Sequence, residues 1–311
     1  MVSAPDTTRA ARHENLYARA RIIQQIRAFF IAHAYLEVET PHRIPCNAPE
    51  EHIEPIPSAG AFLQTSPELC MKRLLAAGYP RLFQLCRCWR NAERGTRHLP
   101  EFTLLEWYAA HSDYRDLMHT CEALLCHLLP TGMLIWQGSN ISIQPPFERI
   151  PLDQAFSRFA PMSLEEALVA DCFEEIYTEH VEPELGTAAP VFIYDYPASM
   201  AALARTRADA PHLAERFELY IGGMELANAF TELTDAHEQR ERFDAALETM
   251  QPPNPQHLMP EAFLAELEHM PPSAGIALGV DRLVMLLTNA AEIDTVVAFT
   301  PEELQAGVRI L

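Results

Sequence analysis

The spacing of hydrophobic and polar residues in the first quarter of the chain predicts a long helix, short strands and a second helix. Residues 9–34 contain good helix formers with apolar side chains at near-helical intervals, which predicts one helix over this range. YLEVETP predicts a short strand that ends at Pro41, and prolines interrupt the following stretch up to Pro57, which predicts a loop. FLQT (62–65) predicts another strand. SPELCMKRLLAAG then predicts a helix with Ser66 as N-cap, Pro67 at the first helical position and Gly78 as its stop.

The rest of the chain alternates strand-like and helix-like patterns and favours antiparallel pairing. Residues 81–90 and 101–109 predict two strands, and the polar segment NAERGTRHLP between them is too long for a tight turn. Further expected elements are a helix over 113–129, weaker strands over 133–136 and 141–143, short helices between 152 and 180, a strand over 191–197, a strand pair within 217–230, helices near 237–250 and 260–268, and a strand running into a helix over 275–287. This order predicts an α+β protein with an antiparallel sheet flanked by helices.

Composition indicates a folded protein with a sizeable core. The chain has 311 residues, of which 49% are hydrophobic and 21% charged, so it has enough apolar side chains to avoid general disorder. Its longest uncharged apolar runs, such as 274–280, are far shorter than the roughly 20 residues that a membrane crossing requires. The first residues lack the apolar core and cleavage site of a secretory signal. We therefore expect a cytoplasmic protein with no membrane partner.

Charge and cysteine usage exclude two classes of site. Lys and Arg number 23 against 43 Asp and Glu, which gives a net charge of −20. Nucleic-acid binding draws its affinity from basic residues that neutralise phosphates, and no dense basic tract is present, so we expect no tRNA partner. The seven cysteines lack the paired spacing of a zinc site or disulfide framework, which favours reduced thiols. Cys86 and Cys88 are expected on one face of a strand, and metal binding there is a minor alternative.

The first candidate site is RLFQLCRCWRNAERGTRHLPEFTLLEWY (81–108), in which two strands and a charged loop would hold basic groups near the edge of the sheet. The two-residue period of its second strand places Phe102, Leu104, Glu106 and Tyr108 on one face. An unpaired buried carboxylate costs several kcal/mol, so Glu106 requires solvent, an internal partner or a cationic ligand. An internal arginine, Arg87 or Arg90, is the simplest partner on physical grounds.

The second candidate site is ERFELYIGGMELANAFTEL (215–233). If Gly222 and Gly223 form a two-residue hairpin turn, Tyr220 faces Glu225 and Glu218 lies diagonally on the same side. Converging carboxylates repel each other unless a cation lies between them, and such oxygen-rich pairs suit Mg²⁺. The alternative is a solvated strand face with the acids splayed apart. Strand parity sends Asn228 and Glu232 to the opposite face, unless a bulge intervenes.

The third candidate site is GIALGVDRLVML (275–286). Gly279 is expected at a junction of strand and helix, where the backbone can approach a ligand closely, and Arg282 falls in the first helical turn. The alternative is an ordinary helix that begins at a glycine and exposes an arginine.

Together and in this order, these segments resemble the signature motifs of class II aminoacyl-tRNA synthetases, most closely the lysyl branch. TSPELCMKRLL, WRN followed by RHLPEFTLLEWY, FELYIGGMELANAFTELTDA and GIALGVDRLVMLL span most of the chain. YLEVETP is similar to motif 1, whose proline corresponds to Pro41 at a dimer interface. The resemblance implies one class II catalytic domain over residues 1–311, a homodimer, and no anticodon-binding domain, because only a few dozen residues precede motif 1.

The shortened lysyl paralogues that this chain resembles attach (R)-β-lysine to a lysine of translation elongation factor P. The resemblance therefore implies an ATP- and Mg²⁺-dependent ligase in which Arg90 and Arg282 serve catalysis. It assigns nucleotide binding to Arg90, Asn91, Arg97, His98, Phe102, Glu225, Leu226, Gly279 and Arg282, magnesium to Glu218 and Glu225, and the amino acid to Ser66, Pro67, Glu68, Glu106, Tyr108, Asn228 and Glu232.

Three positions depart from the usual lysyl pattern. Motif 2 reads Arg-Asn-Ala here, with Glu93 one position late, which puts the usual contact to the adenine amine in doubt. Ala229 replaces a glycine and would add a methyl near the pocket. Ala277 also replaces a glycine and would narrow the pocket beneath the amino acid, which favours a β-amino acid. Two alternatives stay open: a minimal enzyme that activates α-lysine for another acceptor, and a noncatalytic regulatory paralogue.

Overall fold

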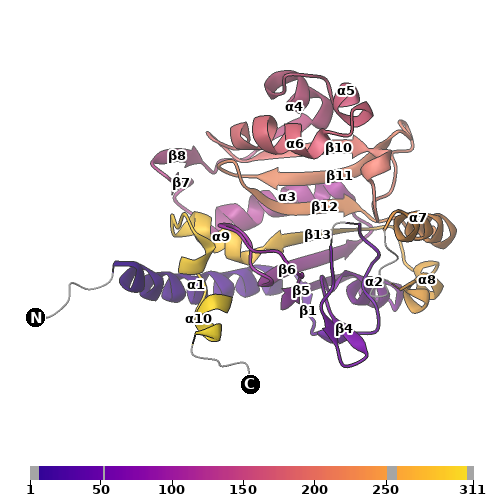
Figure 1. Ribbon diagram of the computed structural model, residues 1–311, viewed down its shortest axis with the longest axis horizontal. Coiled ribbons are helices and arrows are strands. Elements are labelled where there is room, and N and C mark those ends of the chain that lie inside the picture. The colour runs from indigo at the N-terminus through magenta and orange to yellow at the C-terminus, as the bar shows by residue number, and fades with distance from the viewer. Residues whose placement is uncertain (1–6, 52, 251–257, 307–311) are drawn as a thin grey trace, which may run out of the picture.

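An eight-stranded sheet forms the centre of the computed structural model, which describes residues 7–51, 53–250 and 258–306 (Figure 1). The strands at its two ends, β1 and β9, run parallel to their neighbours, and the inner pairings are antiparallel. In spatial order the strands are β1 (Leu36–Glu37), β5 (Arg81–Trp89), β6 (Glu101–Ala110), β13 (Ser273–Gly279), β12 (Glu225–Thr231), β11 (Leu213–Tyr220), β10 (Val191–Pro197) and β9 (Glu148–Pro151).

Helices cover both sides of this sheet. The main core lies between one face and the helices α1 (Thr7–Ala32), α3 (Tyr114–Leu128) and α9 (Val280–Leu287). A second apolar cluster joins the other face to α2 (Glu68–Ala76), α7 (Ala236–Thr249) and α8 (Glu261–Leu267). The expected α+β class, an antiparallel sheet flanked by helices, is therefore confirmed.

The remaining elements are short. α4 (Leu152–Phe159), α5 (Leu164–Val169), α6 (Phe173–Ile176) and a π-helical turn (Tyr177–Val181) pack beside β9 and β10 at the top of Figure 1. The others are the small sheet of β2 (Arg43–Ile44), β4 (Ala61–Leu63) and β3 (Pro57–Ser58), the hairpin of β7 (Met133–Trp136) and β8 (Ser139–Ser142), 3₁₀ turns at Glu182–Glu184, Ala198–Met200 and Ile293–Thr295, and α10 (Pro301–Gln305).

The two faces of the central strands differ: one packs into the main apolar core, and the other carries polar and charged side chains among apolar ones. On β6, Leu105 and Trp107 are fully buried in the main core, whereas Leu104, Glu106 and Tyr108 face the other side. This division follows the two-residue period of a strand and confirms the expected faces of this segment. The polar face of the sheet is where the candidate site residues gather.

The hairpin of β11 and β12 confirms the expected turn, and a bulge in it decides the strand parity that the sequence left open. Gly222 and Gly223 form its two-residue tip with φ of 61° and 66°, a conformation that favours glycine. Tyr220 pairs with Glu225, but the register shifts by one residue before Leu219 pairs with Ala227. This bulge reverses strand parity, so that Asn228 lies on the same face as Glu218.

Three expectations about local structure are corrected. The strand expected over YLEVETP comprises only Leu36–Glu37, because the chain then leaves the edge of the sheet. Helix α2 takes Pro67 as its N-cap, although the Ser66 hydroxyl still accepts a hydrogen bond from the Glu68 amide at 3.0 Å. Ala229 is fully buried in the main core, so its methyl group points away from the polar face and not toward the pocket.

The cysteines match the expectation of reduced thiols. All seven are free, and Cys86 and Cys88 share a face with their sulfur atoms 3.9 Å apart. Burial raises the pKa of the Cys88 thiol well above its usual range, which disfavours the thiolate form that binds metals. Within residues 7–51, 53–250 and 258–306, no helix combines the length and apolar character that a membrane crossing requires.

Candidate active site

Two adjoining cavities lie on the polar face of the sheet. The larger has a volume of about 510 Å³ and the smaller about 150 Å³. Their shared walls are formed by Glu50, Arg90, Leu104, Asn228 and Ala277. A ligand that fills both cavities therefore passes over these residues, and two ligands placed side by side meet there.

One row of directly opposed residues crosses four strands, and every member of the row except Glu218 lines one or both cavities. Glu106 of β6 pairs with Ala277 of β13, Ala277 pairs with Asn228 of β12, and Asn228 pairs with Glu218 of β11. Because opposed residues of neighbouring strands point to the same face, this row gathers side chains from three distant sequence segments on one surface.

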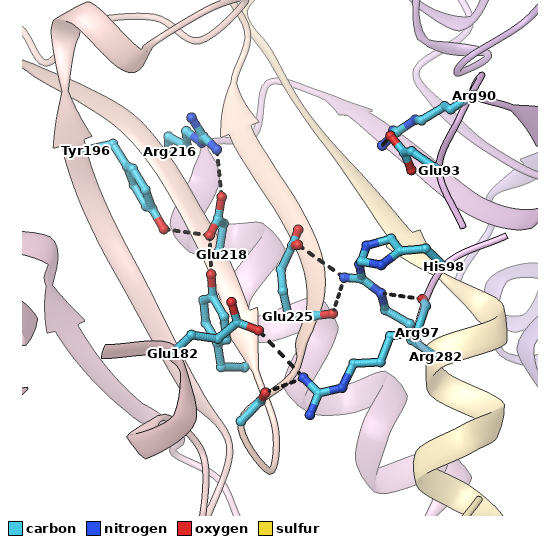
Figure 2. A network of polar contacts seen from close by, with 12 residues as sticks. Arg90, Glu93, Arg97, His98, Glu182, Tyr196, Arg216, Glu218, Glu225 and Arg282 are labelled. Atoms are coloured by element: carbon cyan, nitrogen blue, oxygen red, sulfur yellow. Dashed lines mark hydrogen bonds and ion pairs between the residues drawn. The ribbon is translucent and has the colours of Figure 1, made fainter. Parts of the chain in front are cut away.

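Arg282 lines the larger cavity, and its contacts connect three segments of the chain (Figure 2). It lies in the first turn of α9 and donates to the Glu225 carbonyl at 2.8 Å and to the Glu225 carboxylate at 3.1 Å. It also contacts the imidazole of His98. Desolvation and the charge of Arg282 lower the pKa of His98 to about 4, so this imidazole is neutral at pH 7.

Arg97 connects the loop between β5 and β6 to the tip of the β11–β12 hairpin. Its guanidinium donates to the Gly223 carbonyl at 2.7 Å and lies 3.6 Å from the Glu182 carboxylate. Burial and the neighbouring charge of Glu225 raise the pKa of Glu182. Glu182 is a third carboxylate beside the predicted pair, and no sequence pattern pointed to it.

Arg90 and Phe102 lie together in the larger cavity. The Arg90 guanidinium lies 5.1 Å from the centre of the Phe102 ring, a cation–π arrangement, and 3.7 Å from the Glu93 carboxylate. Ala92 adopts a left-handed conformation with φ of 58°, and Glu93, one position late in the motif, lines this cavity together with Arg90. Asn91 is exposed and does not contribute to the walls of either cavity.

Glu106 forms the floor of the smaller cavity and is 1% exposed. Its carboxylate accepts hydrogen bonds from the Ser66 hydroxyl at 2.6 Å and from the Tyr108 hydroxyl at 2.7 Å. Burial, together with the nearby charge of Glu68, raises the pKa of Glu106 to about 8. The expectation of an internal arginine partner is wrong, because both carboxylate oxygens bind hydroxyl groups.

A buried lysine holds two of the other predicted acids. Lys72 is 1% exposed and forms ion pairs with Glu68, at 2.6 Å, and with Glu232. Burial raises the pKa of Glu232 to about 8 despite the opposing charge of Lys72. Glu232 lies behind Gly275, where an added Cβ would come within 2.3 Å of its carboxylate. The i, i+4 spacing of Glu68 and Lys72 was a signal for this pair in the sequence.

Pro67 and Glu50 differ from what the sequence suggested. Pro67 caps α2 without lining either cavity, so its placement is structural. Glu50, from the loop between β2 and β3, lines both cavities although it was not predicted. Burial and the charge of Glu68 raise the pKa of Glu50 to about 7. The smaller cavity thus contains Glu50, Glu68 and Glu106 as lining acids.

Comparison with known proteins identifies the family. The family model described as tRNA synthetases class II (D, K and N) matches residues 4–303. This chain is a class II tRNA synthetase family member. It is similar to proteins named "Elongation factor P--(R)-beta-lysine ligase" from Edwardsiella ictaluri (strain 93-146) and from Salmonella arizonae (strain ATCC BAA-731 / CDC346-86 / RSK2980). Each is 41% identical over 92% of this chain and 94% of the relative.

The two acids predicted to bind a metal, Glu218 and Glu225, differ in their hydrogen bonding and exposure. Both Tyr196 and Tyr220 donate to Oε2 of Glu218, and Arg216 donates to its Oε1 at 2.6 Å (Figure 2). A carboxylate oxygen accepts two hydrogen bonds, so Oε1 of Glu218 keeps one lone pair. The side chain of Glu225 is 37% exposed. Burial, opposed by Arg216 but reinforced by Glu225, raises the pKa of Glu218.

Magnesium fits this site of the class II synthetase only with help from other oxygen donors. Among the residues that the structure describes, no three His, Cys, Asp or Glu side chains are grouped to hold a metal ion. Glu218 and Glu225 could each offer a carboxylate oxygen, and Mg²⁺ characteristically completes its octahedral shell with water and substrate phosphates. The residues present therefore suit a metal that arrives with a nucleotide.

Proposed function

We propose that this class II synthetase activates (R)-β-lysine with ATP and transfers it to a lysine side chain of elongation factor P. The observation that carries the proposal is the pair of joined cavities, one lined by Arg90, Arg97 and Arg282 and the other by the buried Glu106 and two further glutamates. Polyphosphate requires the first environment, and a doubly cationic amino acid requires the second. The names of the similar ligases support the choice of amino acid and acceptor.

The larger cavity suits ATP. Phe102 provides a flat apolar surface for adenine, and Gly279 leaves the junction of β13 and α9 open, since an added Cβ there would meet only the Arg282 side chain at 3.7 Å. Arg282, Arg97 and His98 are placed for the terminal phosphates. Glu93 is the carboxylate available for the adenine amine that the usual motif residue no longer provides.

Adenylate formation needs orientation and charge stabilisation more than a side-chain nucleophile. The carboxylate of the amino acid attacks the α-phosphorus of ATP, a carboxylate-oxygen-to-phosphorus bond forms, and pyrophosphate leaves. Arg90 lines both cavities and is placed to stabilise the charge that develops on the α-phosphate. Magnesium held by Glu218 and Glu225 would supply charge neutralisation on the phosphates.

The amino acid is held by its two ammonium groups. Glu106, with Tyr108 and Ser66, binds one of them, and Glu68, Asn228 and Gly275 line the same cavity. Lys72 pairs with Glu68 and Glu232 and holds both acids in place. Buried acids of this kind discriminate strongly against uncharged competitors, because such a competitor would leave them unpaired. In the second step, a neutral lysine amine of the acceptor attacks the adenylate carbonyl, AMP leaves and the amine loses a proton.

Organisation and location form part of the same proposal. The matched region spans 94% of the named ligases, which supports a single catalytic domain as the working unit without tRNA. Pro41 and the partly unpaired edge of β5 border a further cavity beside α1, which supports a homodimer interface there. An acceptor that acts in translation supports a cytoplasmic location.

The test is incubation of the protein with ATP, Mg²⁺, (R)-β-lysine and elongation factor P, followed by intact mass measurement. We expect the acceptor to gain the mass of one lysyl residue, and to gain none when ATP or Mg²⁺ is omitted. Pyrophosphate exchange with α-lysine and β-lysine separates the proposal from the α-lysine alternative. A clear preference for the α isomer, or no exchange with either, would contradict it.

A further inference from the structure

The smaller cavity contains a second arginine in addition to Arg90. Arg216 lies on β11, two residues before Glu218, and its side chain is only 17% exposed. A guanidinium remains charged at any ordinary pH, so a buried one needs anionic or polar partners. Arg216 stands in the second candidate segment, but neither that segment nor the proposed reaction gives it a role.

Contacts within the described chain fix the orientation of the Arg216 side chain but do not use all of its hydrogen-bond donors. It donates to Glu218 Oε1 at 2.6 Å, to the Met200 carbonyl at 2.8 Å and to Asn228 Oδ1 at 3.2 Å, and it stacks 4.5 Å from the centre of the Tyr196 ring. A guanidinium has five N–H groups, so these three hydrogen bonds within the described chain leave two for a ligand. The side chain is therefore oriented in advance and retains donors.

The strand pairing places Arg216 on the amino-acid side of the site. A second row of opposed residues runs from Tyr108 through Gly275 and Phe230 to Arg216, next to the row that contains Glu106 and Asn228. Arg216 reaches back from this row to Asn228, whose side chain lines both cavities. Its guanidinium thus lies in the smaller cavity, in contact with a residue that both cavities share.

The charges along the smaller cavity match an amino acid laid across the sheet. Glu106 lies at one end, and Asn228 lies two strands away, which corresponds to about 10 Å between backbones; Arg216, one strand further, reaches back to Asn228. An ammonium group at the acidic end would direct the carboxylate of the same molecule toward the arginines. Arg90 and Arg216 together form a cationic end for that carboxylate.

We propose that Arg216 binds the carboxylate of the amino acid substrate and holds it for attack on the α-phosphorus. This inference rests on the proposed function of the site. The two arginines have different roles. Arg216 binds only the carboxylate, whereas Arg90 lines both cavities and contacts the carboxylate and the α-phosphate. Glu218 and Tyr196 act through Arg216 as positioning residues, because they fix the plane of its guanidinium.

The test compares ligands that differ only in the charge at this end. Binding of (R)-β-lysine and (R)-β-lysinamide, whose carboxylate is replaced by a neutral amide, is measured by calorimetry for the wild type, Arg216→Lys and Arg216→Gln. The wild type should bind the acid at least tenfold more tightly than the amide. Arg216→Gln should lose most of this preference while its affinity for the amide changes little, and Arg216→Lys should retain part of it.

If Arg216 only supports the fold, its substitution should not change the preference for the acid over the amide. If Arg216→Gln weakens binding of both ligands equally, or leaves the preference unchanged, the inference is overturned. Should Arg216→Gln fail to fold, Arg216→Lys carries the same comparison, because loss of the fork geometry alone should reduce the preference. Arg205→Gln is the matched control, since Arg205 is a half-exposed arginine paired with Glu215 and lines neither cavity.

The proposed function fails in a distinguishable way. The wild type is also titrated with α-lysine and α-lysinamide, and its pyrophosphate exchange is measured with both isomers. If it selects α-lysine, the proposed substrate is wrong, while the role of Arg216 is decided on the α pair. If the wild type binds none of the four ligands, both proposals are overturned.

Discussion

The charged side chains at the two ends of the site have different partners. At the phosphate end, Arg282 and Arg97 pair with Glu225, Glu182 and backbone carbonyls of the β11–β12 hairpin. At the amino-acid end, Glu106 meets only hydroxyl groups, and burial raises its pKa to about 8. The arginines of the phosphate end are satisfied internally, whereas Glu106 has hydroxyl groups and no cation as its described partners.

This difference indicates how each ligand is selected. A polyphosphate must displace the existing ion pairs of Arg97 and Arg282. Ion pairs between partly exposed groups are individually weak, so each exchange contributes little net binding free energy. A dication at the amino-acid end relieves carboxyl groups that burial has already destabilised in their charged form. Specificity should therefore be sharper for the amino acid, and pH should affect its binding more than that of ATP.

Removal of Arg282 should have the largest effect. Arg282→Ala takes away a preorganised donor for phosphate charge, and loss of one such donor typically costs about 10²–10³-fold in rate. We expect pyrophosphate exchange to fall by at least this factor, with little change in the thermal unfolding midpoint. Arg240→Ala, which removes an exposed ion pair with Glu261, is the control. An unchanged exchange rate would remove the mechanism proposed for the phosphate end.

Neutralising Glu106 should damage the other end selectively. Glu106→Gln keeps the size of the side chain but loses a charged partner for the substrate, a change worth roughly 1.5–3 kcal/mol, or about 10- to 100-fold in KM for (R)-β-lysine. The KM for ATP should hardly change. Glu101→Gln, on the exposed start of the same strand, serves as control. Equal rises in both KM values would show that the two ends are not independent.

The free protein should become less stable as pH rises from about 5 to 8. Glu106 and Glu50 have folded-state pKa values of about 8 and about 7, above those of unfolded glutamate, so the folded state binds more protons in this range. The slope of the unfolding free energy with pH is then negative. Urea unfolding at pH 5.5 and 8 measures this loss.

Saturating (R)-β-lysine should offset that loss, because its ammonium groups favour the charged carboxylates. Its KM should fall as pH rises toward 8. The KM for ATP should lack a matching dependence on His98, whose pKa of about 4 keeps it neutral throughout this range. A KM for (R)-β-lysine that is constant between pH 6 and 8 would contradict the raised pKa values at the acidic end.

Local patterns predicted the elements well, but distant pairings decided the site. The two-residue period placed Glu106 correctly, and the paired glycines at 222 and 223 predicted their turn. The partners of Glu106 were not predictable, because Ser66 lies 40 positions away and only the folded sheet brings it close. Arg216 was missed for the same reason, since its neighbour Asn228 meets it only through the bulge.

The smallest expected effect comes from a substitution of Ala277, which lies between the amino-acid end and the phosphate end of the site. Ala277 stands directly between Glu106 and Asn228 and lines both cavities, so its methyl group limits how close the substrate amine can lie to the carboxylate. One methyl group changes selectivity by about 1–3 kcal/mol. Ala277→Gly should therefore raise kcat/KM for α-lysine relative to (R)-β-lysine by roughly tenfold. Ala229→Gly is the matched control, because its methyl faces the main core, and a shift in that variant as well would trace the effect to backbone flexibility.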